Sequence, residues 1–258
     1  MDINSLNSFV HEGRIVWTMT TIGYIKYTLN LIHWLRTIAK VPWTLCVVCC
    51  DDDCEKVFRR DKIPCISWRG DKVRRTQTGM AAFGTPSFEK CNQQKLAVLE
   101  WFARNYSECG IEYSLYLDGD IVVQKDPWPL LLPTFSQAEN MLFQCDCFNP
   151  DVHEDGVGCD YICSGVIATH HVSVKQTELY VFEKELWETV SKQDQPFIGS
   201  RLKTTETPYK ILNRRDFGNG AWQKSGKWKD GNWCLIHYNY FVSGTKRKAM
   251  QKENHWLV

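Results

Sequence analysis

The chain has 258 residues, a formal net charge of +1 and 43% hydrophobic residues. This length suffices for one sizeable α/β domain, and the charge balance argues against a general nucleic-acid binder, which carries a clear basic excess. No apolar run approaches the roughly 20 residues that a membrane span needs, and residues 1–10 lack the pattern of a secretory signal. We therefore expect a cytoplasmic protein without a membrane span; a piece of a longer, anchored chain is the alternative.

The 12 cysteines are expected to be free thiols. Several lie inside apolar runs such as residues 45–50, and a free cysteine behaves as a small buried hydrophobic residue. Without a secretory signal, reduced thiols are favoured over disulfides. Zinc binding by Cys46 and Cys49 is disfavoured, because the pair lies in a strand-like run and no second Cys-x-x-Cys follows.

Strand-like and helix-like stretches alternate in the first half of the chain. The expected strands are 14–20, 44–50, 65–68 and 113–117, and the expected helices are 24–39, a short one capped by residues 51–53, and 87–106. The run 44–50 is almost entirely apolar, as in a buried strand of a parallel sheet. This order predicts an α/β fold with a mainly parallel central sheet that is flanked by helices.

The second half of the chain is less regular. The expected elements are strands at 141–144 and 165–169, a long helix over 173–192, twisted strands over 222–236 with a turn at Asp230-Gly231, and a short helix over 244–252. No linker divides the chain. We therefore predict a single domain that covers residues 1–258.

Polar residues follow three of the predicted strands at their carboxyl ends, where sheets of this type bind ligands. They are Thr20 with Thr21, Asp51 with Asp52, and Asp118-Gly119-Asp120. The last group lies between two apolar runs, and burying its two carboxylates is costly unless a cation neutralises them. Carboxylate oxygens suit Mg²⁺ and Mn²⁺, and Gly119 would let the backbone approach a ligand closely.

The Asp-x-Asp pattern alone is weak evidence. A chain of this size contains about one by chance, and a second lies at Asp51 and Asp53. A turn whose aspartates face water or cap a helix is the structural alternative for Asp118 and Asp120. His237 favours the metal site, because it ends the apolar run 233–236 and because imidazole with carboxylate is a suitable Mn²⁺ ligand set.

Taken in order, these residues resemble the nucleotide-diphospho-sugar transferases of the GT-A fold. Segment 115–127 resembles the family's "DxD, then DP" signature, and Cys163-Ser164-Gly165 resembles the strand that follows it. Asp194-Gln195-Pro196 is similar to the DQ element, and segment 237–248 is similar to the C-terminal "H-x-N…G…K". The resemblance covers roughly residues 14–250, and the missing anchor is more like small cytosolic or large-DNA-virus members than plant Golgi members.

The resemblance implies a metal-dependent glycosyltransferase that moves a hexose or pentose from a nucleotide diphosphate sugar, usually a UDP-sugar, to a glycan or other hydroxyl acceptor. Asp120 and His237 would bind Mn²⁺ or Mg²⁺, and Asp118 would bind the metal or the ribose. The cation would stabilise the diphosphate leaving group. A nucleotide-binding half at about 14–125 and an acceptor-binding, catalytic half at about 126–258 are also implied.

The resemblance further assigns substrate contacts to residues outside the metal set. Positive charge at the phosphates would come from Lys95 and from Lys246 or Lys248. The nucleotide base would lie near Thr20, Thr21 and Asp51, and the donor sugar near Ser164 and Gly165. Gly119, Asn239 and Gly244 complete the expected substrate-binding set.

Asp194 and Gln195 are the catalytic candidates. In an inverting enzyme, Asp194 would accept the proton of the acceptor. In a retaining enzyme, which the related families favour, this loop would line the face of the anomeric carbon, with Gln195 in contact. The alternative is structural: Asp194 would cap a helix that begins at Gln195-Pro196.

Three further interpretations stay open. Trp222, Trp228 and Trp233 form either a core or a stacking wall for an acceptor sugar. A metal-dependent phosphohydrolase would use the same carboxylates for a water nucleophile, but it generally needs more metal ligands than are visible in the sequence. A non-catalytic carbohydrate-binding protein would keep the fold without turnover, and the intact Asp118, Asp120 and His237 argue against it.

Overall fold

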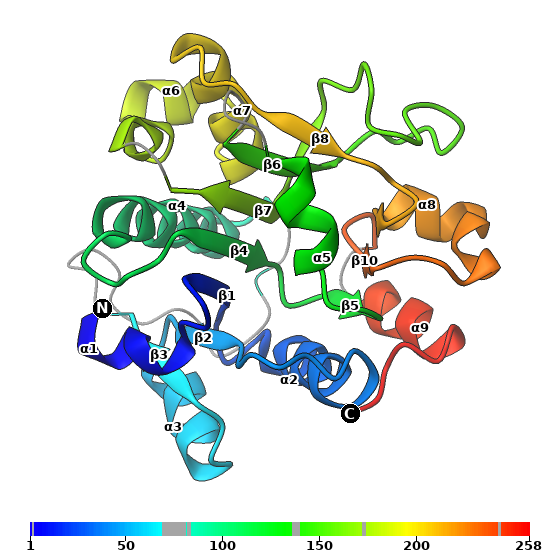
Figure 1. The fold of residues 1–258 in the computed structure, drawn as a ribbon, viewed down its shortest axis with the longest axis horizontal. Helices are drawn as coiled ribbons and strands as arrows, with labels where there is room; N and C mark the ends of the chain where they lie inside the picture. The colour runs from blue at the N-terminus through cyan, green and yellow to red at the C-terminus, as the bar shows by residue number, and fades with distance from the viewer. Residues whose placement is uncertain (2, 69–80, 82–83, 136–139, 172–173, 242–243) are drawn as a thin grey trace. The chain divides into compact units, whose positions relative to one another are not determined.

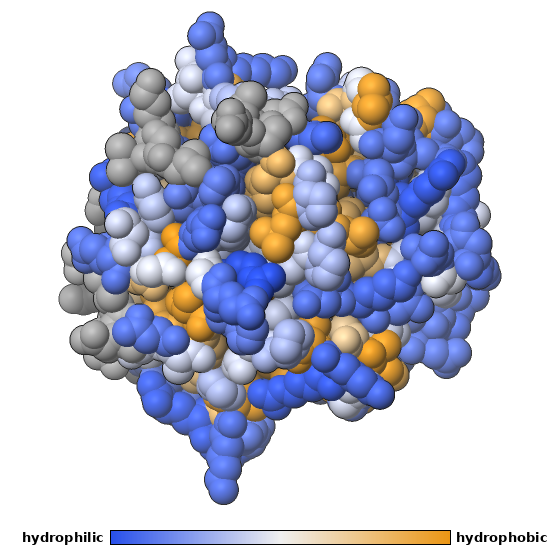
Figure 2. Space-filling model, in the orientation of Figure 1, coloured by the Kyte–Doolittle hydropathy of each residue, from blue (hydrophilic) through white to orange (hydrophobic). Residues whose placement is uncertain are grey.

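The computed structural model describes residues 1, 3–68, 81, 84–135, 140–171, 174–241 and 244–258. Ser173, the predicted first residue of a long helix, lies outside these ranges. No helix in the described part of the chain is both long and apolar enough to cross a bilayer. On the face drawn in Figure 2, hydrophilic residues predominate and the hydrophobic ones form separate small patches.

Within the described residues, ten strands form two sheets, and most of them are labelled in Figure 1. The strands are β1 (Arg14–Thr20), β2 (Cys46–Cys49), β3 (Cys65–Ser67), β4 (Tyr113–Leu117), β5 (Ile121–Val123), β6 (Met141–Cys145), β7 (Ile162–His170), β8 (Lys210–Leu212), β9 (Phe217–Gly218) and β10 (Leu235–His237). Seven of them make a mostly parallel sheet in the order β3-β2-β1-β4-β7-β6-β8, and the other three make the sheet β5-β10-β9. The predicted α/β fold with a mainly parallel central sheet is confirmed.

Nine α-helices accompany the sheets in the described residues. They are α1 (Ile3–Leu6), α2 (Ile25–His33), α3 (Asp52–Arg60), α4 (Pro86–Asn105), α5 (Trp128–Leu131), α6 (Lys184–Thr189), α7 (Asp194–Thr204), α8 (Gly220–Ser225) and α9 (Gly244–Lys252). A π-helix (Trp34–Ile38) continues α2, and short 3-10 helices lie at Asn7–Phe9, Leu132–Thr134, Val174–Leu179 and Lys227–Asp230.

The chain divides into two compact units, each built from three separate segments. The first unit comprises Met1–Ile25, Trp43–Leu115 and Thr169–Pro208, and the second comprises Lys26–Pro42, Tyr116–Ala168 and Tyr209–Val258. Strands β4 and β7 contribute residues to both. The predicted functional halves, at about 14–125 and 126–258, stay a prediction.

In the first unit, the carboxylate of Asp51, just after β2, accepts two backbone hydrogen bonds. The Asp51 Oδ1 atom accepts a hydrogen bond of 2.7 Å from the Cys54 backbone N–H and thereby caps α3, as its sequence predicted. The Oδ2 atom of the same carboxylate accepts a hydrogen bond of 2.8 Å from the Ile22 backbone N–H. Asp51 therefore links the segment after β1 to the start of α3.

We expect Asp51→Ala to lower the free energy of unfolding by about 1–2 kcal/mol, because it removes a helix cap and leaves two backbone N–H groups without their acceptor. Asp53→Ala is the matched control. The Asp53 side chain is exposed and pairs only with the exposed Lys56, so its loss should change stability by less than about 0.5 kcal/mol. Urea-induced unfolding measures both, and equal losses would contradict the capping role.

In the second unit, the small sheet brings distant segments of the chain together. Strand β10 runs antiparallel to β5, with His237 opposite Ile121, and parallel to β9. All residues of β5 and β10 are buried. The C-terminal tail returns to α2, where the Leu257 backbone N–H donates a hydrogen bond of 2.7 Å to Asn30 Oδ1 (Figure 1).

Most predicted elements are confirmed. The strands at 14–20 and 113–117 and the helix at 244–252 have the predicted bounds, and most of the others agree within three residues. The predicted helix over 24–39 is present as α2 and the π-helix. All twelve cysteines lie among the described residues and are free thiols, as expected.

The predicted long helix over 173–192 is wrong. The described residues instead form a 3-10 helix (Val174–Leu179) and, after an interruption, α6 (Lys184–Thr189). The interruption contains Tyr180-Val181-Phe182, and aromatic and β-branched residues are poor helix formers. Tyr180 is buried while Phe182 is 43% exposed, so the apolar side chains do not share one helical face.

The predicted twisted strands over 222–236 are also wrong, apart from β10 itself. The segment begins within α8 and continues through a 3-10 helix (Lys227–Asp230). Asn219 Oδ1 caps α8 by accepting a hydrogen bond of 3.0 Å from the Trp222 backbone N–H. Gly226, at a φ of 77°, ends the helix in a left-handed conformation that glycine adopts without strain. This cap and this stop outweigh the aromatic content that favoured strands.

Trp222 and Trp233 of this segment belong to the core, and the half-buried Trp228 packs against Trp233. Trp222 and Trp233 are each 4% exposed. Trp228 and Trp233 pack around the His255 ring, with centroid distances of 4.9 and 5.5 Å, and Trp34 joins them at 5.3 Å. Of the two interpretations of these tryptophans, the packing supports the core and not a stacking wall.

Candidate functional site

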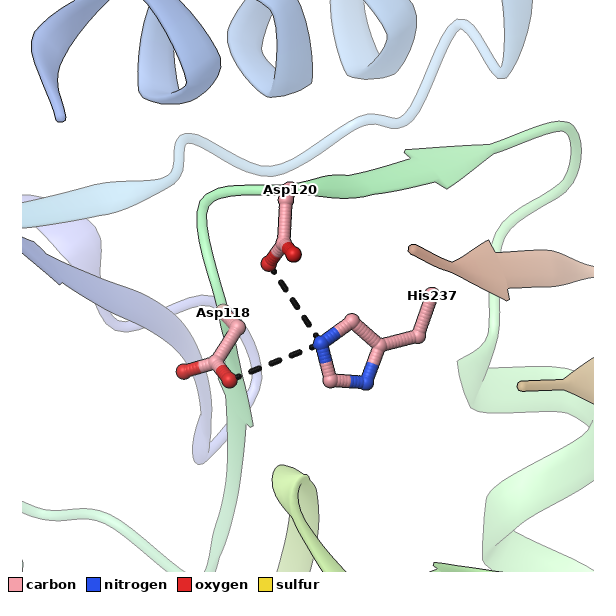
Figure 3. Close-up of side chains that lie close together, drawn as sticks. All are labelled: Asp118, Asp120 and His237. Carbon is pink, nitrogen blue, oxygen red and sulfur yellow. Dashed lines mark ion pairs between the residues drawn. The ribbon is translucent and has the colours of Figure 1, made fainter. Parts of the chain in front are cut away.

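Three potential metal ligands converge in the second unit (Figure 3). Asp118 directly follows β4, Asp120 directly precedes β5, and His237 is the last residue of β10. The Nε2 atom of His237 lies 3.3 Å from Asp120 Oδ1 and 3.6 Å from Asp118 Oδ2. One ligand atom from each residue lies within 4.8 Å of the other two, and no other such group of three occurs in the part of the chain that the structure describes.

The backbone holds this triad in place. Because β10 pairs antiparallel with β5, His237 lies opposite Ile121 and beside Asp120. The Tyr238 backbone N–H donates a hydrogen bond of 3.3 Å to the Asp120 carbonyl oxygen, and the Asp118 backbone N–H donates one of 2.8 Å to the Gly165 carbonyl oxygen. Three segments that are distant in the sequence are thus joined at one point.

Gly165 leaves room for the triad. A Cβ atom added at this position would lie 2.1 Å from His237 Cε1 and 2.7 Å from Asp118 Oδ2. At such distances one of the two side chains would have to shift, so glycine at this position lets His237 and Asp118 lie where they do. The resemblance assigned Gly165 to the donor sugar, and that assignment stays a prediction.

A buried lysine neutralises Asp120. The Asp120 side chain is 2% exposed and forms an ion pair and hydrogen bond with Lys246 of α9. Burial alone would raise the pKa of Asp120, but the ammonium charge of Lys246, together with the contact to His237, outweighs burial and holds this pKa well below its ordinary value. Lys246 is buried whereas Lys248 is exposed, so of the two lysines only Lys246 reaches the triad.

Tyr116 of the preceding strand, β4, orients the side chain of Asp118. The Tyr116 hydroxyl donates a hydrogen bond to Asp118 Oδ1, and this leaves Oδ2 as the oxygen that faces His237. The Asp118 side chain is 29% exposed and therefore reaches solvent, unlike Asp120. The pair combines one buried carboxylate with one accessible carboxylate.

Other predicted residues of the second unit lie close in sequence to Gly165, His237 and Lys246. Ser164 is buried in β7 next to Gly165, and Gly244 is the first residue of α9. Asn239 Oδ1 accepts a hydrogen bond of 2.7 Å from the Gly220 backbone N–H, while its Nδ2 donates one of 2.7 Å to Asp146 Oδ1. Asn239 therefore links the segment after β10 to the end of β6.

The remaining predicted residues belong to the first unit. Lys95 of α4 and Asp194 of α7 are both buried and form an ion pair of 2.8 Å. Helix α7 begins at Asp194 itself, after Gln193, so Asp194 is not the cap of this helix. Gln195 follows it in the first turn. Thr20 and Thr21 are buried at the end of β1 and directly after it.

The sequence analysis did not include Gln144 or Asp146 among the site residues, and it named Cys163 only as part of the Cys163-Ser164-Gly165 motif. Gln144 Oε1 lies 3.0 Å and Cys163 Sγ lies 3.4 Å from the Nδ1 atom of His237. A signal for Gln144 was present: it is the one polar residue in the apolar run 141–145, all of which is buried. A buried amide within an apolar strand requires a specific partner.

No family model matches the sequence, and no curated protein matches it either. Solved structures do match in fold. The apo form of mouse xyloside xylosyltransferase 1 aligns with a TM-score of 0.53 at 13% identity, over 88% of this chain and 98% of that one. Glycosyltransferase GlyE of Streptococcus pneumoniae TIGR4 gives 0.55 at 15%, over 94% of this chain and 60% of that one. Galactosyltransferase LgtC in complex with donor and acceptor sugar analogs gives 0.54 at 12%, over 93% and 94%.

The fold is therefore that of the GT-A glycosyltransferases, as the sequence motifs predicted. At these identities the similarity establishes the fold, and many activities can share one fold. The activity has to be argued from the residues of the site.

Proposed function

We propose that this protein is a metal-dependent glycosyltransferase that transfers a sugar from a UDP-sugar to a hydroxyl group of a glycan or similar acceptor. The observation that carries the proposal is the convergence of Asp118, Asp120 and His237 at strand ends within a GT-A fold. Catalysis of sugar transfer requires charge stabilisation at a diphosphate leaving group, and a site of carboxylates and imidazole can hold the cation that provides it.

The donor set fits Mn²⁺ or Mg²⁺. Two carboxylates and one imidazole place their ligand atoms within 4.8 Å of one another, and these ligand types suit both ions, with imidazole favouring Mn²⁺. The contact of Gly165 with His237 and Asp118 keeps this space open. When bound, such a cation neutralises charge on the diphosphate as the glycosidic bond breaks.

The surrounding side chains have separate tasks in this proposal. Tyr116 orients Asp118 through its hydroxyl hydrogen bond. Lys246 balances the charge of Asp120 in the absence of a cation and, once Asp120 is neutralised otherwise, its ammonium group is available to phosphate oxygens. Asp118, as the more exposed carboxylate, is also accessible to a ribose hydroxyl.

The remaining assignments stay proposals of the same scheme. They place Thr20, Thr21 and Asp51 at the nucleotide base, Lys95 at the phosphates, Gly119, Ser164, Asn239 and Gly244 at the donor, and Asp194 with Gln195 at the reacting sugar in a retaining transfer. A cytoplasmic location and the absence of a nucleic-acid partner likewise remain predictions. A phosphohydrolase is disfavoured, because the described residues offer one ligand group of only three side chains.

The variants Lys246→Met and Lys248→Met test which of the two lysines contacts the phosphates of the donor. Lys246→Met removes a cation that competes for Asp120, so Mn²⁺ binding without nucleotide should strengthen several-fold. The same variant should weaken UDP binding in the presence of Mn²⁺ by about tenfold or more, since a charge-assisted contact is lost. Isothermal titration measures both affinities. The reverse pattern, with Lys248→Met alone weakening UDP binding, would refute the assignment of Lys246.

A thermal-shift screen tests the proposed function as a whole. A panel of nucleotide sugars is added with Mn²⁺ or with a chelator, because a ligand that binds only the folded state raises its melting temperature. We expect UDP and at least one UDP-sugar to stabilise the protein only when Mn²⁺ is present. Stabilisation by other nucleotides but not by UDP would overturn the choice of donor.

A further inference from the structure

Gln144 is a fully buried amide whose orientation is determined by its contacts. It lies in β6, where every residue is buried, and its own exposed fraction is 0%. Its Nε2 atom donates hydrogen bonds to the carbonyl oxygens of Phe217, at 3.2 Å, and Gly218, at 2.8 Å. Carbonyl oxygens only accept hydrogen bonds, so the NH₂ group has to face them. The amide oxygen, Oε1, is therefore the atom that faces the opposite side.

The opposite side is the imidazole of His237. Gln144 Oε1 lies 3.0 Å from His237 Nδ1, and because an amide oxygen carries no proton, Nδ1 has to be the donor. Cys163 Sγ also lies near Nδ1, at 3.4 Å, but it is itself within reach of the Asn239 Nδ2 donor at 3.7 Å. The proton on Nδ1 thus has a strong acceptor in Gln144 and a weak one in Cys163.

This proton placement determines which nitrogen can bind a cation. With Nδ1 protonated, only Nε2 of the neutral ring has a lone pair, and Nε2 is the atom 3.3 Å from Asp120 and 3.6 Å from Asp118. The opposite tautomer would direct an N–H group at the ligand site. Histidine ligands in metal sites are commonly fixed in this manner by an acceptor at the other ring nitrogen.

We propose that Gln144 is a positioning residue that fixes His237 as the Nδ1-protonated tautomer and so makes Nε2 a metal ligand. The inference rests on the proposed function, since it assumes a cation at Asp118, Asp120 and His237. It assigns a second task to a residue whose NH₂ group already serves the carbonyl oxygens of Phe217 and Gly218.

The test compares Gln144→Met with Gln144→Glu. Methionine keeps the length of the side chain but offers no strong acceptor, so we expect Mn²⁺ affinity to fall about 10–100-fold. Glutamate loses the NH₂ group that serves the Phe217 and Gly218 carbonyls, as methionine does, but it still accepts from Nδ1. Mn²⁺ affinity should therefore recover in Gln144→Glu. If Gln144 served only those two carbonyls, both variants would be equally impaired.

A second readout does not depend on metal. Nitrogen-15 NMR of the metal-free protein distinguishes the two ring nitrogens of His237, with the signals assigned by their loss in His237→Asn. Because Nε2 faces two carboxylates, the informative signal is the proton on Nδ1: we expect it in the wild type and in Gln144→Glu, and a partial loss of it in Gln144→Met. Gln94→Met, which removes a buried amide of α4 in the first unit, should change neither the tautomer nor Mn²⁺ affinity.

The failures of the two proposals are distinguishable. A wild-type ring without a proton on Nδ1, or unchanged Mn²⁺ affinity and Nδ1 protonation in Gln144→Met, would overturn the role of Gln144. A wild-type protein with the proton on Nδ1 but without measurable Mn²⁺ binding would instead overturn the proposed metal site and leave the tautomer assignment standing.

Discussion

Asp120→Asn is expected to abolish Mn²⁺-dependent UDP binding and to lower the rate of sugar transfer by about 10²–10³-fold or more. Asparagine keeps the shape of the side chain but removes the buried negative charge that faces His237 and Lys246. The substitution also leaves the Lys246 ammonium group without its counter-charge. Losing one partner of a buried ion pair costs up to about 3–5 kcal/mol of stability, so folding has to be measured alongside binding.

Two further variants separate ligand loss from fold loss. Asp120→Asn combined with Lys246→Met removes both charges and should recover much of the stability without recovering Mn²⁺ binding. Asp151→Asn removes a carboxylate of the same unit that is 75% exposed and pairs with Lys227, and it should leave binding unchanged. Mn²⁺-dependent UDP binding that persists in folded Asp120→Asn would refute the metal assignment.

Gly165→Ala should weaken Mn²⁺ binding at the site without removing any proposed ligand. The new Cβ would lie 2.1 Å from His237 Cε1 and 2.7 Å from Asp118 Oδ2, so the imidazole or the carboxylate has to move. The ring has little freedom to do so, because it is 3% exposed and held by Gln144. Overpacking of this kind typically costs about 1–3 kcal/mol, and we expect Mn²⁺ affinity to fall by more than tenfold.

The control for this substitution is Gly110→Ala in the first unit. Its Cβ would meet nothing within 4 Å, but the residue has a φ of 63°, a left-handed conformation that costs other residues about 1–2 kcal/mol. It should therefore lower stability to a similar degree while leaving Mn²⁺ affinity intact. Titration with Mn²⁺ and the melting temperatures of both variants distinguish a local effect on the site from a general loss of stability. Wild-type Mn²⁺ affinity in Gly165→Ala would contradict the described geometry.

Local patterns in the sequence were sufficient to predict the sheet and to select Asp118, Asp120 and His237, which the structure brings together. Apolar runs such as 44–50 and 113–117 predict buried strands. Asp118 and Asp120 are candidates because carboxylates that follow a buried apolar run generally need a partner that neutralises them. His237 is a candidate because it follows a second apolar run, at 233–236. The three side chains come together because β10 pairs with β5, and this pairing cannot be read from local sequence.

One error has a local cause, and the omissions come from contacts between distant residues. The aromatic segment 222–236 has the composition of strands, but Asn219 and Gly226 bound a helix, α8, that overlaps its first residues. The two candidate lysines could not be distinguished by spacing, since only the packing of α9 buries Lys246 and exposes Lys248. Gln144 is 93 residues away from His237 in the sequence, and no local pattern joins them.

The most direct test of metal-dependent sugar transfer is the release of UDP from a panel of UDP-sugars, measured with Mn²⁺ and with a chelator. Glycosyltransferases hydrolyse their donor slowly when water takes the place of the acceptor, so the test needs no knowledge of the acceptor. We predict that UDP is released from at least one donor, only with Mn²⁺, and that release is lost in Asp120→Asn. Release of inorganic phosphate in place of UDP, or UDP release that is unaffected by the chelator, would contradict this function.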